Sequence, residues 1–482
     1  MGNNKQQRAE RYDLLPLRQL ADQAFSRAAG AHLIGGNHVR LLKDAKENYP
    51  AWLEAIRAAK NHVHFENYIF CDDNTGREFA DSLIDKAREG VSVRLIYDWL
   101  GCLGKASPRF WNALRSGGVE VRCYNPLRLD RPLGWISRDH RKMLAIDGEI
   151  AFIAGLCIGQ KWLGDPERMI EPWRDTGVEI RGSSVIEVEQ AFARIWAWTG
   201  EPLSRAAFPE TTLPEGEMNL RIVASEPATT GMIRLDQLIA ALARKRLWLT
   251  DAYYGGTATY MEALRAAAND GVDVRLLLPN TTDIPLLQPL SRTGYRPLLE
   301  AGVRLFEWNG TMLHAKTAVA DGTWARVGST NLNIASWIGN CELDVIVEDE
   351  SFGAKMEEMY EEDLAHATEI VLDRHRRPHA AVELPRKQLS AGVGSASRAA
   401  AGVLRIGNTL GTTLINRRRV FSPIGARLTA ITGLLLFVLS VLFALFPKAL
   451  AYPLVALGAW GGLTLLYRGY QLAKQKKTNK RE

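Results

Sequence analysis

The sequence predicts an α/β protein with two homologous lobes, each a mixed β-sheet covered by helices, and a transmembrane helical hairpin at the C-terminus. Two observations lead to this prediction. A series of alternating strands and helices occurs twice between about residues 38 and 365, with repeated sequence words. Two uncharged apolar runs then follow near the end of the chain. The length of 482 residues also exceeds that of one typical domain.

The first series begins with a buried strand over residues 62–70 (HVHFENYIF). Segment 76–89 is predicted to be helical, because its apolar side chains recur at helical spacing. A strand at 91–99, a short helix at 108–115 and a strand at 119–124 complete the series.

The second series repeats this order. Its predicted elements are a strand at 247–254, a helix at 260–269, a strand at 272–278, a helix that ends near 301–302 and a strand at 303–306. REGVSVRL at 88–95 matches NDGVDVRL at 269–276, and in both a Gly-Val pair joins helix to strand. Glycine suits the left-handed turn that ends a helix. The duplication therefore predicts two related, helix-covered lobes with a shared interface.

These patterns divide the chain into six parts. They are a polar N-terminal extension at 1–37, a first lobe at 38–210, a second lobe at 211–370, a basic linker at 371–427, the hairpin at 428–467 and a basic tail at 468–482. The linker contains apolar residues at helical spacing, so an interfacial amphipathic helix and a loosely ordered segment remain alternative interpretations of it.

The hairpin prediction depends on residues 428–446 and 449–467, which carry no charge. Each run is close to the roughly 20 residues that cross a bilayer. Arginines precede the pair and six basic residues follow it, so the positive-inside rule places both ends in the cytoplasm. Two buried core helices are the alternative. The N-terminus has no apolar stretch that would indicate a signal peptide.

The composition indicates an anionic binding partner but does not identify its chemical class. A net charge of +6 suits an anionic partner, whether nucleic acid, an acidic membrane surface or a phosphorylated substrate. The five cysteines form no C-x-x-C pair, which argues against a disulfide framework or a zinc site. His62 and His64 share a strand face without an evident acidic or cysteine partner, so neither a metal nor a cofactor is expected. No signal for an oligomeric state is present.

Chemistry is indicated by two H-x-K-x4-D motifs, at His140–Asp147 and His314–Asp321. Residues i and i+2 of a strand point to the same face, so each histidine projects beside a lysine, Lys142 or Lys316. A neutral imidazole can attack phosphorus, and lysine is a compact cation for phosphate oxygens. Two such copies at the ends of matching strand–helix series are hard to explain by packing.

Further polar residues follow the second motif. Gly328 to Asn331 read G-S-T-N, and Ser329 and Asn331 would donate hydrogen bonds to developing negative charge. Both motif aspartates are grouped with the catalytic residues, each at a turn before a glycine. The corresponding segment of the first half reads A-G-L-C and ends in Cys157, a poor substitute for an amide donor.

The two motifs, together with DGEIAFIAGLCIG at 147–159 and HAKTAVADGTWARVGSTNLN at 314–333, resemble the phospholipase D superfamily and, within it, the bacterial cardiolipin synthases. The resemblance covers about residues 38 to 365. It implies a two-lobed fold with one site at a pseudo-twofold interface, a covalent phosphohistidine intermediate and no metal.

The resemblance also implies roles for individual residues. One motif histidine is the nucleophile and the other the general acid; the halves are chemically alike, and we favour His140 as nucleophile and His314 as acid. The two lysines and Asn331 would hold the phosphoryl oxygens. An acidic residue after each motif would orient the imidazole of that half: Asp175 in the first half and Glu342 in the second.

The expected function is that of a phosphatidyltransferase at the cytoplasmic membrane that joins two phosphatidylglycerol molecules into cardiolipin and releases glycerol. A phospholipase D-type hydrolase would use the same residues with water as acceptor. A nuclease is a weaker alternative, since the basic charge permits nucleic acid but the hairpin argues against it. Segment 129–137, with apolar Leu133, Trp135 and Ile136, has no counterpart in the second half and would shield the site from water.

Overall fold

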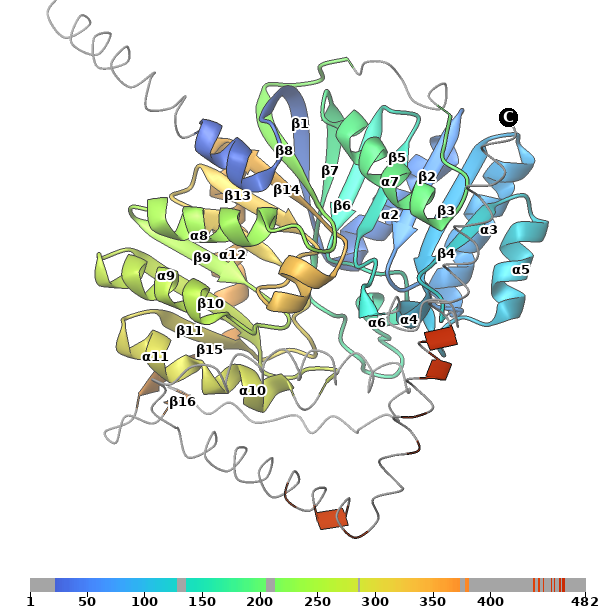
Figure 1. Cartoon of the computed structure of the whole chain (residues 1–482). Coiled ribbons are helices and arrows are strands. Elements are labelled where there is room, and N and C mark those ends of the chain that lie inside the picture. The colour runs from blue at the N-terminus through green and yellow to red at the C-terminus, as the bar shows by residue number, and fades with distance from the viewer. Residues whose placement is uncertain are drawn as a thin grey trace, which may run out of the picture. The chain divides into compact units, whose positions relative to one another are not determined.

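The computed structural model describes residues 22–127, 136–204, 213–284, 287–372 and 378–380, with single positions between 437 and 463. The chain divides into two units, and the larger one carries the labelled strands and helices (Figure 1). The larger comprises residues 1–126 and 136–416, and the smaller comprises residues 127–135 and 417–482. The larger unit holds the sheet and both motifs.

The larger unit is built on one β-sheet, and the strands of its two halves follow the same order from the centre of the sheet outward. The first half contributes β1 (Ile34–Lys43), β2 (His62–Asn67), β3 (Ser92–Asp98), β4 (Glu120–Tyr124), β5 (Lys142–Ile146), β6 (Ile150–Ala154) and β7 (Thr176–Gly182). The second half contributes β8 (Met218–Ser225), β9 (Arg246–Thr250), β10 (Asp273–Pro279), β11 (Arg304–Trp308), β12 (Thr317–Ala320), β13 (Trp324–Gly328) and β14 (Glu342–Glu348), followed by β15 (Ala367–Leu372) and β16 (Pro378–Ala380).

From the centre outward the first half runs β1-β7-β6-β5-β2-β3-β4, and the second half runs β8-β14-β13-β12-β9-β10-β11. In each half the last three strands of this series are parallel to one another, and the three before them pair antiparallel. Beyond β11 the second half adds β15 and β16, which also pair antiparallel. This confirms two homologous lobes with mixed sheets. The strands β1 and β8 join the lobes as an antiparallel pair.

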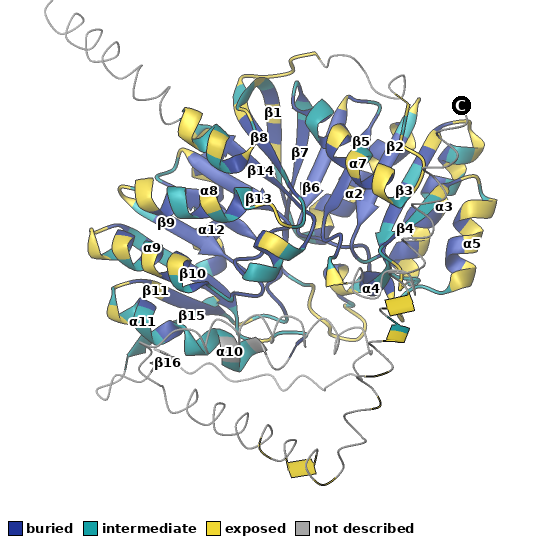
Figure 2. Ribbon diagram, viewed as in Figure 1, coloured by how far each residue is buried: buried dark blue, intermediate teal, exposed yellow. Residues whose placement is uncertain are grey.

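Helices cover the faces of the sheet (Figures 1 and 2). Those of the first lobe are α2 (Asp44–Ala58), α3 (Asn74–Arg88), α4 (Trp99–Cys102), α5 (Pro108–Ser116), α6 (Gln160–Leu163) and α7 (Val185–Thr199). Those of the second are α8 (Gly231–Leu242), α9 (Ala258–Asn269), α10 (Leu287–Thr293), α11 (Tyr295–Glu300), the π-helix η3 (Ala335–Gly339) and α12 (Glu350–Ala365). Each lobe has its own apolar core, and a third core contains residues of both lobes. The lobes therefore share a buried interface.

The predicted elements agree with the observed ones to within a few residues. The clearest case is the repeated Gly-Val connection: Gly90 and Gly271 both adopt a left-handed backbone, with φ of +94° and +90°. Asp73 and Thr257 cap the helices α3 and α9 through their side chains, by accepting hydrogen bonds from the first turn.

Two details of the predicted organisation are wrong. Strand β1 begins at Ile34, so the boundary at residue 38 falls inside a strand. Residues 22–29 are helical, and Asp22 forms an ion pair with Arg221 of β8, so part of the predicted polar extension packs on the second lobe.

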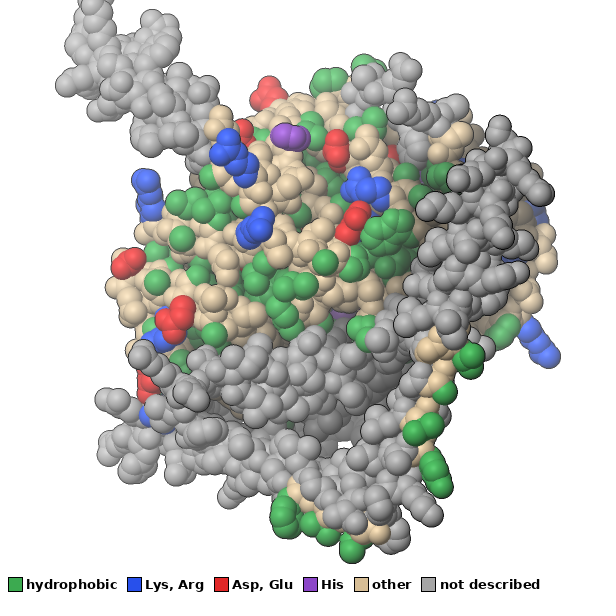
Figure 3. Space-filling view, viewed as in Figure 1, with side chains coloured by type: hydrophobic (Ala, Val, Ile, Leu, Met, Phe, Trp, Pro, Cys, Tyr) green, Lys and Arg blue, Asp and Glu red, His purple; other side chains and the backbone are tan. Residues whose placement is uncertain are grey.

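Apart from single positions between 437 and 463, the predicted hairpin at 428–467 lies outside the described residues, as does most of the predicted linker. Within the part of the chain that the structure describes, no helix combines the length and the apolar character that a membrane crossing requires. On the face drawn in Figure 3, the described acidic and basic side chains are interspersed.

Candidate active site

The two H-x-K motifs lie at the ends of interior strands of the sheet: one leads into β5 of the first lobe and the other into β12 of the second. Lys142 is the first residue of β5 and pairs with Asn67 at the end of β2. Lys316 precedes β12, whose Thr317 pairs with Thr250 at the end of β9. The histidines and lysines of both motifs are buried, with at most 5% of their surface exposed.

Backbone hydrogen bonds tie each motif to the opposite lobe. The amide of His140 donates to the carbonyl of Cys341 at 2.9 Å, and the amide of Cys341 donates to Arg138. In the related contact the amide of His314 donates to the carbonyl of Arg174 at 2.7 Å, and the amide of Arg174 donates to Met312. Each motif thus pairs with the segment that leads into the last antiparallel strand of the other lobe.

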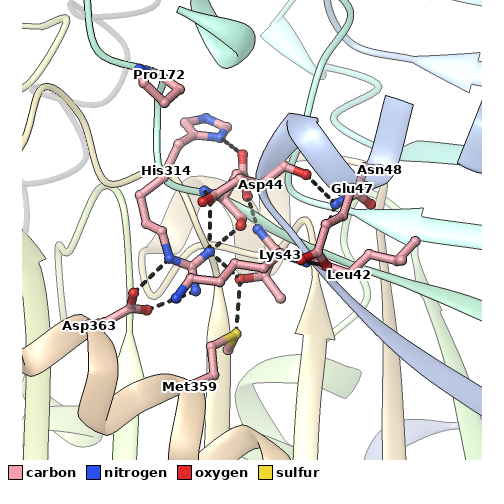
Figure 4. Close-up of polar contacts among 12 residues, drawn as sticks. Leu42, Lys43, Asp44, Glu47, Asn48, Pro172, His314, Met359 and Asp363 are labelled. Atoms are coloured by element: carbon pink, nitrogen blue, oxygen red, sulfur yellow. Dashed lines mark hydrogen bonds and ion pairs between the residues drawn. The ribbon is translucent and has the colours of Figure 1, made fainter. Parts of the chain in front are cut away.

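The side chains follow the same crossing. Nδ1 of His140 lies 2.9 Å from Oε2 of Glu342. Nδ1 of His314, which is labelled in Figure 4, lies 2.7 Å from Oδ2 of Asp175. Both carboxylates are predicted from the sequence, but each is predicted to orient the histidine of its own half, and this pairing is wrong. The strands β7 and β14 flank the centre of the sheet, so the residues that precede or begin them reach the opposite motif.

The segment around Asp175 is braced from two helices. The neighbouring Arg174 guanidinium donates to both carboxylate oxygens of Asp363 on α12, at 2.7 and 2.8 Å, and to Asp44 on α2 at 3.2 Å (Figure 4). Asp44 also accepts the backbone amide of Asp175 at 2.9 Å. These contacts fix the backbone that carries the partner of His314.

The two carboxylates are supported differently. Oε2 of Glu342 accepts a hydrogen bond from the hydroxyl of Ser329 at 2.6 Å. Gly155 stands at the matching position in the first lobe, and a Cβ there would lie 2.1 Å from Oδ1 of Asp175. Asp175 is supported instead by the indole of Trp162, which donates to Oδ2 at 3.1 Å. The glycine thus makes room for a carboxylate that packs against the backbone.

Ser329 is predicted to bind phosphate, but its hydroxyl has other partners. Besides donating to Glu342, it accepts the backbone amide of Leu343 at 2.9 Å. These contacts fit a residue that positions the carboxylate. Asn331 is also buried, and its Oδ1 atom has no hydrogen-bond partner among the described residues. Its Nδ2 atom donates to the Ser336 hydroxyl at 3.4 Å and carries a second hydrogen that can be donated to a ligand.

The motif aspartates lie away from the histidines. Asp147 accepts backbone hydrogen bonds from Lys60, Asn61 and His62 at 2.7–2.8 Å. Asp321 accepts the equivalent three, from residues 244–246 at 2.8–2.9 Å. Asp147 lies five positions beyond Lys142 along an extended strand, which is about 16 Å at about 3.3 Å per residue. The prediction that the two aspartates act with the catalytic residues is therefore wrong. Asp147 holds the start of β2, and Asp321 holds the start of β9.

Aromatic rings surround both histidines. The ring of Tyr68 lies 4.9 Å from that of His140, and the ring of Tyr253 lies 5.8 Å from that of His314. Each tyrosine also contacts the lysine of its motif, with ring-to-Nζ distances of 5.1 and 5.7 Å. Trp162 and Trp173 add two more rings beside His314. The site is therefore buried and largely apolar around its charges.

This environment shifts the titration of the site. Burial and the charge of Lys316 lower the pKa of His314 to about 4, against the opposing influence of Asp175. Burial and the charge of Lys142 lower the pKa of Lys316 to about 8. Burial raises the pKa of Glu342, whereas in Asp175 the attraction of His314 and Lys316 outweighs burial and lowers the pKa. The charge of Lys142 thus disfavours the charged form of Lys316, and an anion bound beside the two ammonium groups would relieve this repulsion.

The acidic partner of His62 and His64 was not predicted from the sequence. Glu189 of α7 hydrogen-bonds both imidazoles, His62 at 2.7 Å, and all three side chains are largely buried. Histidine and glutamate side chains also bind metal ions, and one possible ligand atom from each of these three residues lies within 4.8 Å of the other two. The cluster is at the opposite end of β2 from Asn67, and it fastens α7 to the sheet.

Comparisons with known proteins agree with this geometry. A family model described as cardiolipin synthase, PLD-like domain, matches residues 52–196 and 236–364. The chain is 32% identical over 373 residues to a cardiolipin synthase of Alkalihalophilus pseudofirmus, a match that covers 73% of this chain and 74% of the relative. It is also 32% identical to a cardiolipin synthase of Halalkalibacterium halodurans, covering 74% of this chain and 75% of the relative.

Among solved structures, the phosphatidylserine synthase of Haemophilus influenzae is similar in fold, with a TM-score of 0.58 at 14% identity. The match covers 72% of this chain and 91% of that structure. The repeated lobes, the paired motifs and the sequence matches lead to one assignment. The chain belongs to the cardiolipin synthase family of phospholipase D-like proteins.

Proposed function

We propose that this protein is a phosphatidyltransferase that converts two molecules of phosphatidylglycerol into cardiolipin and glycerol. The observation that carries the proposal is the pair of buried His-Lys motifs whose histidines are each oriented by a carboxylate of the other lobe. Two relatives of similar length are named cardiolipin synthases, which supports the choice of substrate.

In the first step the Nε2 atom of His140 attacks the phosphorus of one phosphatidylglycerol. Nδ1 of that ring faces Glu342, so Nε2 is the nitrogen directed at the substrate, and the carboxylate stabilises the positive charge that develops on the ring. The bond from phosphorus to the headgroup glycerol oxygen breaks. His314 gives a proton to that oxygen, and glycerol leaves.

In the second step the neutral His314 removes a proton from a hydroxyl of a second phosphatidylglycerol. The resulting oxygen attacks phosphorus, the bond to His140 breaks, and cardiolipin is released. A phosphodiester is present before and after, so the two steps use the same groups in opposite order. Lys142, Lys316 and the Asn331 amide would hold the phosphoryl oxygens throughout.

The protonation states fit once the substrate is bound. In the ligand-free site the nearby lysine charges help to keep the pKa of His314 low. A phosphodiester anion between the lysines offsets those charges and raises the pKa of His314 toward a range in which it donates a proton at neutral pH.

The proposal places the catalytic unit at the cytoplasmic face of the membrane, where a second lipid is locally concentrated. The uncharged runs at 428–446 and 449–467 and their basic flanks would anchor it there. The deep burial of both motifs favours a lipid alcohol over water as acceptor, because a closed site protects the covalent intermediate from hydrolysis.

The decisive test is product analysis with purified protein and phosphatidylglycerol labelled in its headgroup and in its acyl chains. We expect label in cardiolipin and in free glycerol. If the main lipid product is phosphatidic acid, the protein is a hydrolase. If trimming residues 129–137 shifts the product from cardiolipin toward phosphatidic acid, that segment shields the site as predicted.

A further inference from the structure

Asn67 is a buried amide in the active site without a structural partner. It is fully buried, and both its Oδ1 and Nδ2 atoms have no hydrogen-bond partner within the described residues. An unsatisfied polar group in a protein interior is costly, and native structures rarely keep one without a reason. A ligand absent from the structure would provide that reason.

The register of the sheet places Asn67 beside the first motif. It stands directly opposite Lys142 in the antiparallel pair of β2 and β5. Opposed residues of such a pair share a face, with Cβ atoms about 4.5–5.5 Å apart. The amide therefore lies next to the lysine that is proposed to hold the phosphoryl group.

The second lobe shows what a structural residue at this position does. Asp251 follows β9 and occupies the position that matches Asn67. Its carboxylate accepts the backbone amides of Leu332 and Tyr253, at 2.9 and 3.1 Å, and so holds the loop after β13. In the first lobe other groups hold the corresponding loop: Ile158 forms backbone bonds with Ile69 and Cys71, and the Tyr49 hydroxyl donates to the carbonyl of Cys157 at 2.5 Å. Asn67 is thus not needed for that task.

The first lobe also lacks an amide where the second has one. Asn331 lies three residues after the end of β13, and Cys157 lies three residues after the end of β6. The thiol of Cys157 is close enough to Lys142 to influence its pKa, but a thiol is a weak donor. An amide in the first half must therefore come from another position beside Lys142.

We propose that Asn67 supplies this amide: its Nδ2 donates a hydrogen bond to a phosphoryl oxygen of the substrate and replaces the donor that Cys157 cannot provide. The inference rests on the proposed phosphatidyl transfer and adds a phosphate ligand to it. The amide oxygen would accept a hydrogen bond from the Lys142 ammonium, which keeps both groups directed at the same anion.

Asn67→Leu tests the proposal, because leucine has a similar volume and no hydrogen-bonding group. We expect kcat for cardiolipin formation to fall about 10²-fold, as for loss of one donor to a developing oxyanion. The melting temperature of the full chain should stay the same or rise, because two unsatisfied atoms disappear. If Asn67 were structural, the melting temperature would fall and activity per folded molecule would persist.

Two further variants sharpen the result. Asn37→Leu is the matched control: Asn37 is equally buried, but its amide bonds Ile34 and its carbonyl accepts Ser184, so this variant should lose stability and keep its activity. Adding Cys157→Asn to Asn67→Leu should raise kcat for cardiolipin formation at least tenfold above that of the single variant Asn67→Leu. A double variant that is no more active than the single one, with an unchanged melting temperature, contradicts the exchange of donors.

Inorganic phosphate provides a readout that does not depend on the lipid reaction. Millimolar phosphate should raise the melting temperature of the wild-type protein, and Asn67→Leu should remove most of that shift. If phosphate stabilises both proteins equally, the Asn67 site is wrong whatever the substrate. If phosphate distinguishes them but phosphatidylglycerol is not converted, the Asn67 site stands and the proposed function fails.

Discussion

His140 of the first lobe receives its carboxylate from the second lobe, with Nδ1 2.9 Å from Oε2 of Glu342. The reverse pairing, His314 with Asp175, spans 2.7 Å. Neither lobe therefore contains both members of an active-site His-carboxylate pair. This explains why the two lobes share one continuous buried core, since a small rotation of one lobe would separate both pairs at once.

Glu342→Gln and Asp175→Asn are each expected to lower kcat about 10²- to 10⁴-fold, because the imidazole loses its tautomeric control. The crossed geometry makes the two defects different. Glu342→Gln should slow formation of the phosphohistidine on His140. Asp175→Asn should slow both formation and transfer, because His314 gives a proton in the first step and takes one in the second. Rapid-quench measurements of the labelled intermediate separate the two steps, with Glu179→Gln on β7 as the control. A Glu342→Gln enzyme that forms the phosphohistidine at the wild-type rate would contradict the pairing of Glu342 with His140.

The roles of the histidines can be separated with a phosphodiester whose leaving group is p-nitrophenolate. This leaving group needs no proton, so His314→Asn should still release one equivalent of p-nitrophenolate and retain phosphorus on His140. His140→Asn should give no burst. The modified residue can be identified by mass spectrometry at alkaline pH, where phosphohistidine is stable. A burst from His140→Asn, with phosphorus on His314, would exchange the two roles.

Local sequence patterns predicted the parts of this protein that depend on local structure. The Gly-Val connections at Gly90 and Gly271 and the i, i+2 spacing of each motif are short-range features, and both are found as predicted. The duplicated series indicated two lobes because repeats in sequence become repeats in structure.

The contacts between distant segments could not be predicted in this way. Glu342 is 202 residues from His140, and Glu189 is 125 residues from His64. Spacing shows that a carboxylate follows each motif, but which imidazole it meets depends on how β7 and β14 lie at the sheet centre. The contact of Ser329 with Glu342 could not be predicted for a related reason: a hydroxyl can donate to a phosphate or to a carboxylate, and spacing does not show which carboxylate lies beside it.

Ser329 donates a hydrogen bond to Glu342, whereas Gly155 at the matching position leaves room for Asp175. Substitutions at these two positions should therefore affect catalysis to different extents. Ser329→Gly copies the first lobe and should lower kcat about tenfold, since one charged hydrogen bond of about 1.5–3 kcal/mol is lost and Glu342 keeps other contacts. Gly155→Ser should lower kcat as far as Asp175→Asn does, because the new Cβ would displace the carboxylate. Steady-state kinetics of both variants, with circular dichroism to verify folding, test this. A Gly155→Ser enzyme with more than half of wild-type activity would show that Asp175 need not hold its position.

The predicted anchor is tested by fractionation and tag accessibility. A chain that ends at residue 372 should leave the membrane or be removed from it by salt, because it lacks both uncharged runs. In the full chain, a tag after Glu482 should be reached only from the cytoplasmic side. A tag that is reached only from outside would mean that the C-terminal region crosses the membrane an odd number of times.

The His62–His64–Glu189 cluster predicts a stability that depends on pH. Although burial acts to raise the pKa of Glu189, hydrogen bonds from both histidines lower it from 4.5 to about 2. Burial lowers the pKa of His64 below 6.5. In both cases the unfolded chain binds protons at a pH where the folded chain does not, so the cluster loses stabilising free energy as pH falls. For His64 the loss begins below about pH 6.5, and for Glu189 it extends from about pH 4.5 toward 2.

Glu189→Gln is therefore expected to destabilise the protein by about 1–3 kcal/mol at pH 7, because buried imidazoles lose their charged partner. The difference from wild type should narrow as pH falls below about 4.5, because the carboxyl then takes up a proton in the unfolded chain while Glu189 of the folded chain stays charged down to about pH 2. Melting temperatures of the full chain measured across this range provide the test, with Glu187→Gln on the same helix as the control. A penalty that stays constant down to the lowest pH at which the protein folds would show that side-chain shape, and not the charge of Glu189, fastens α7 to β2.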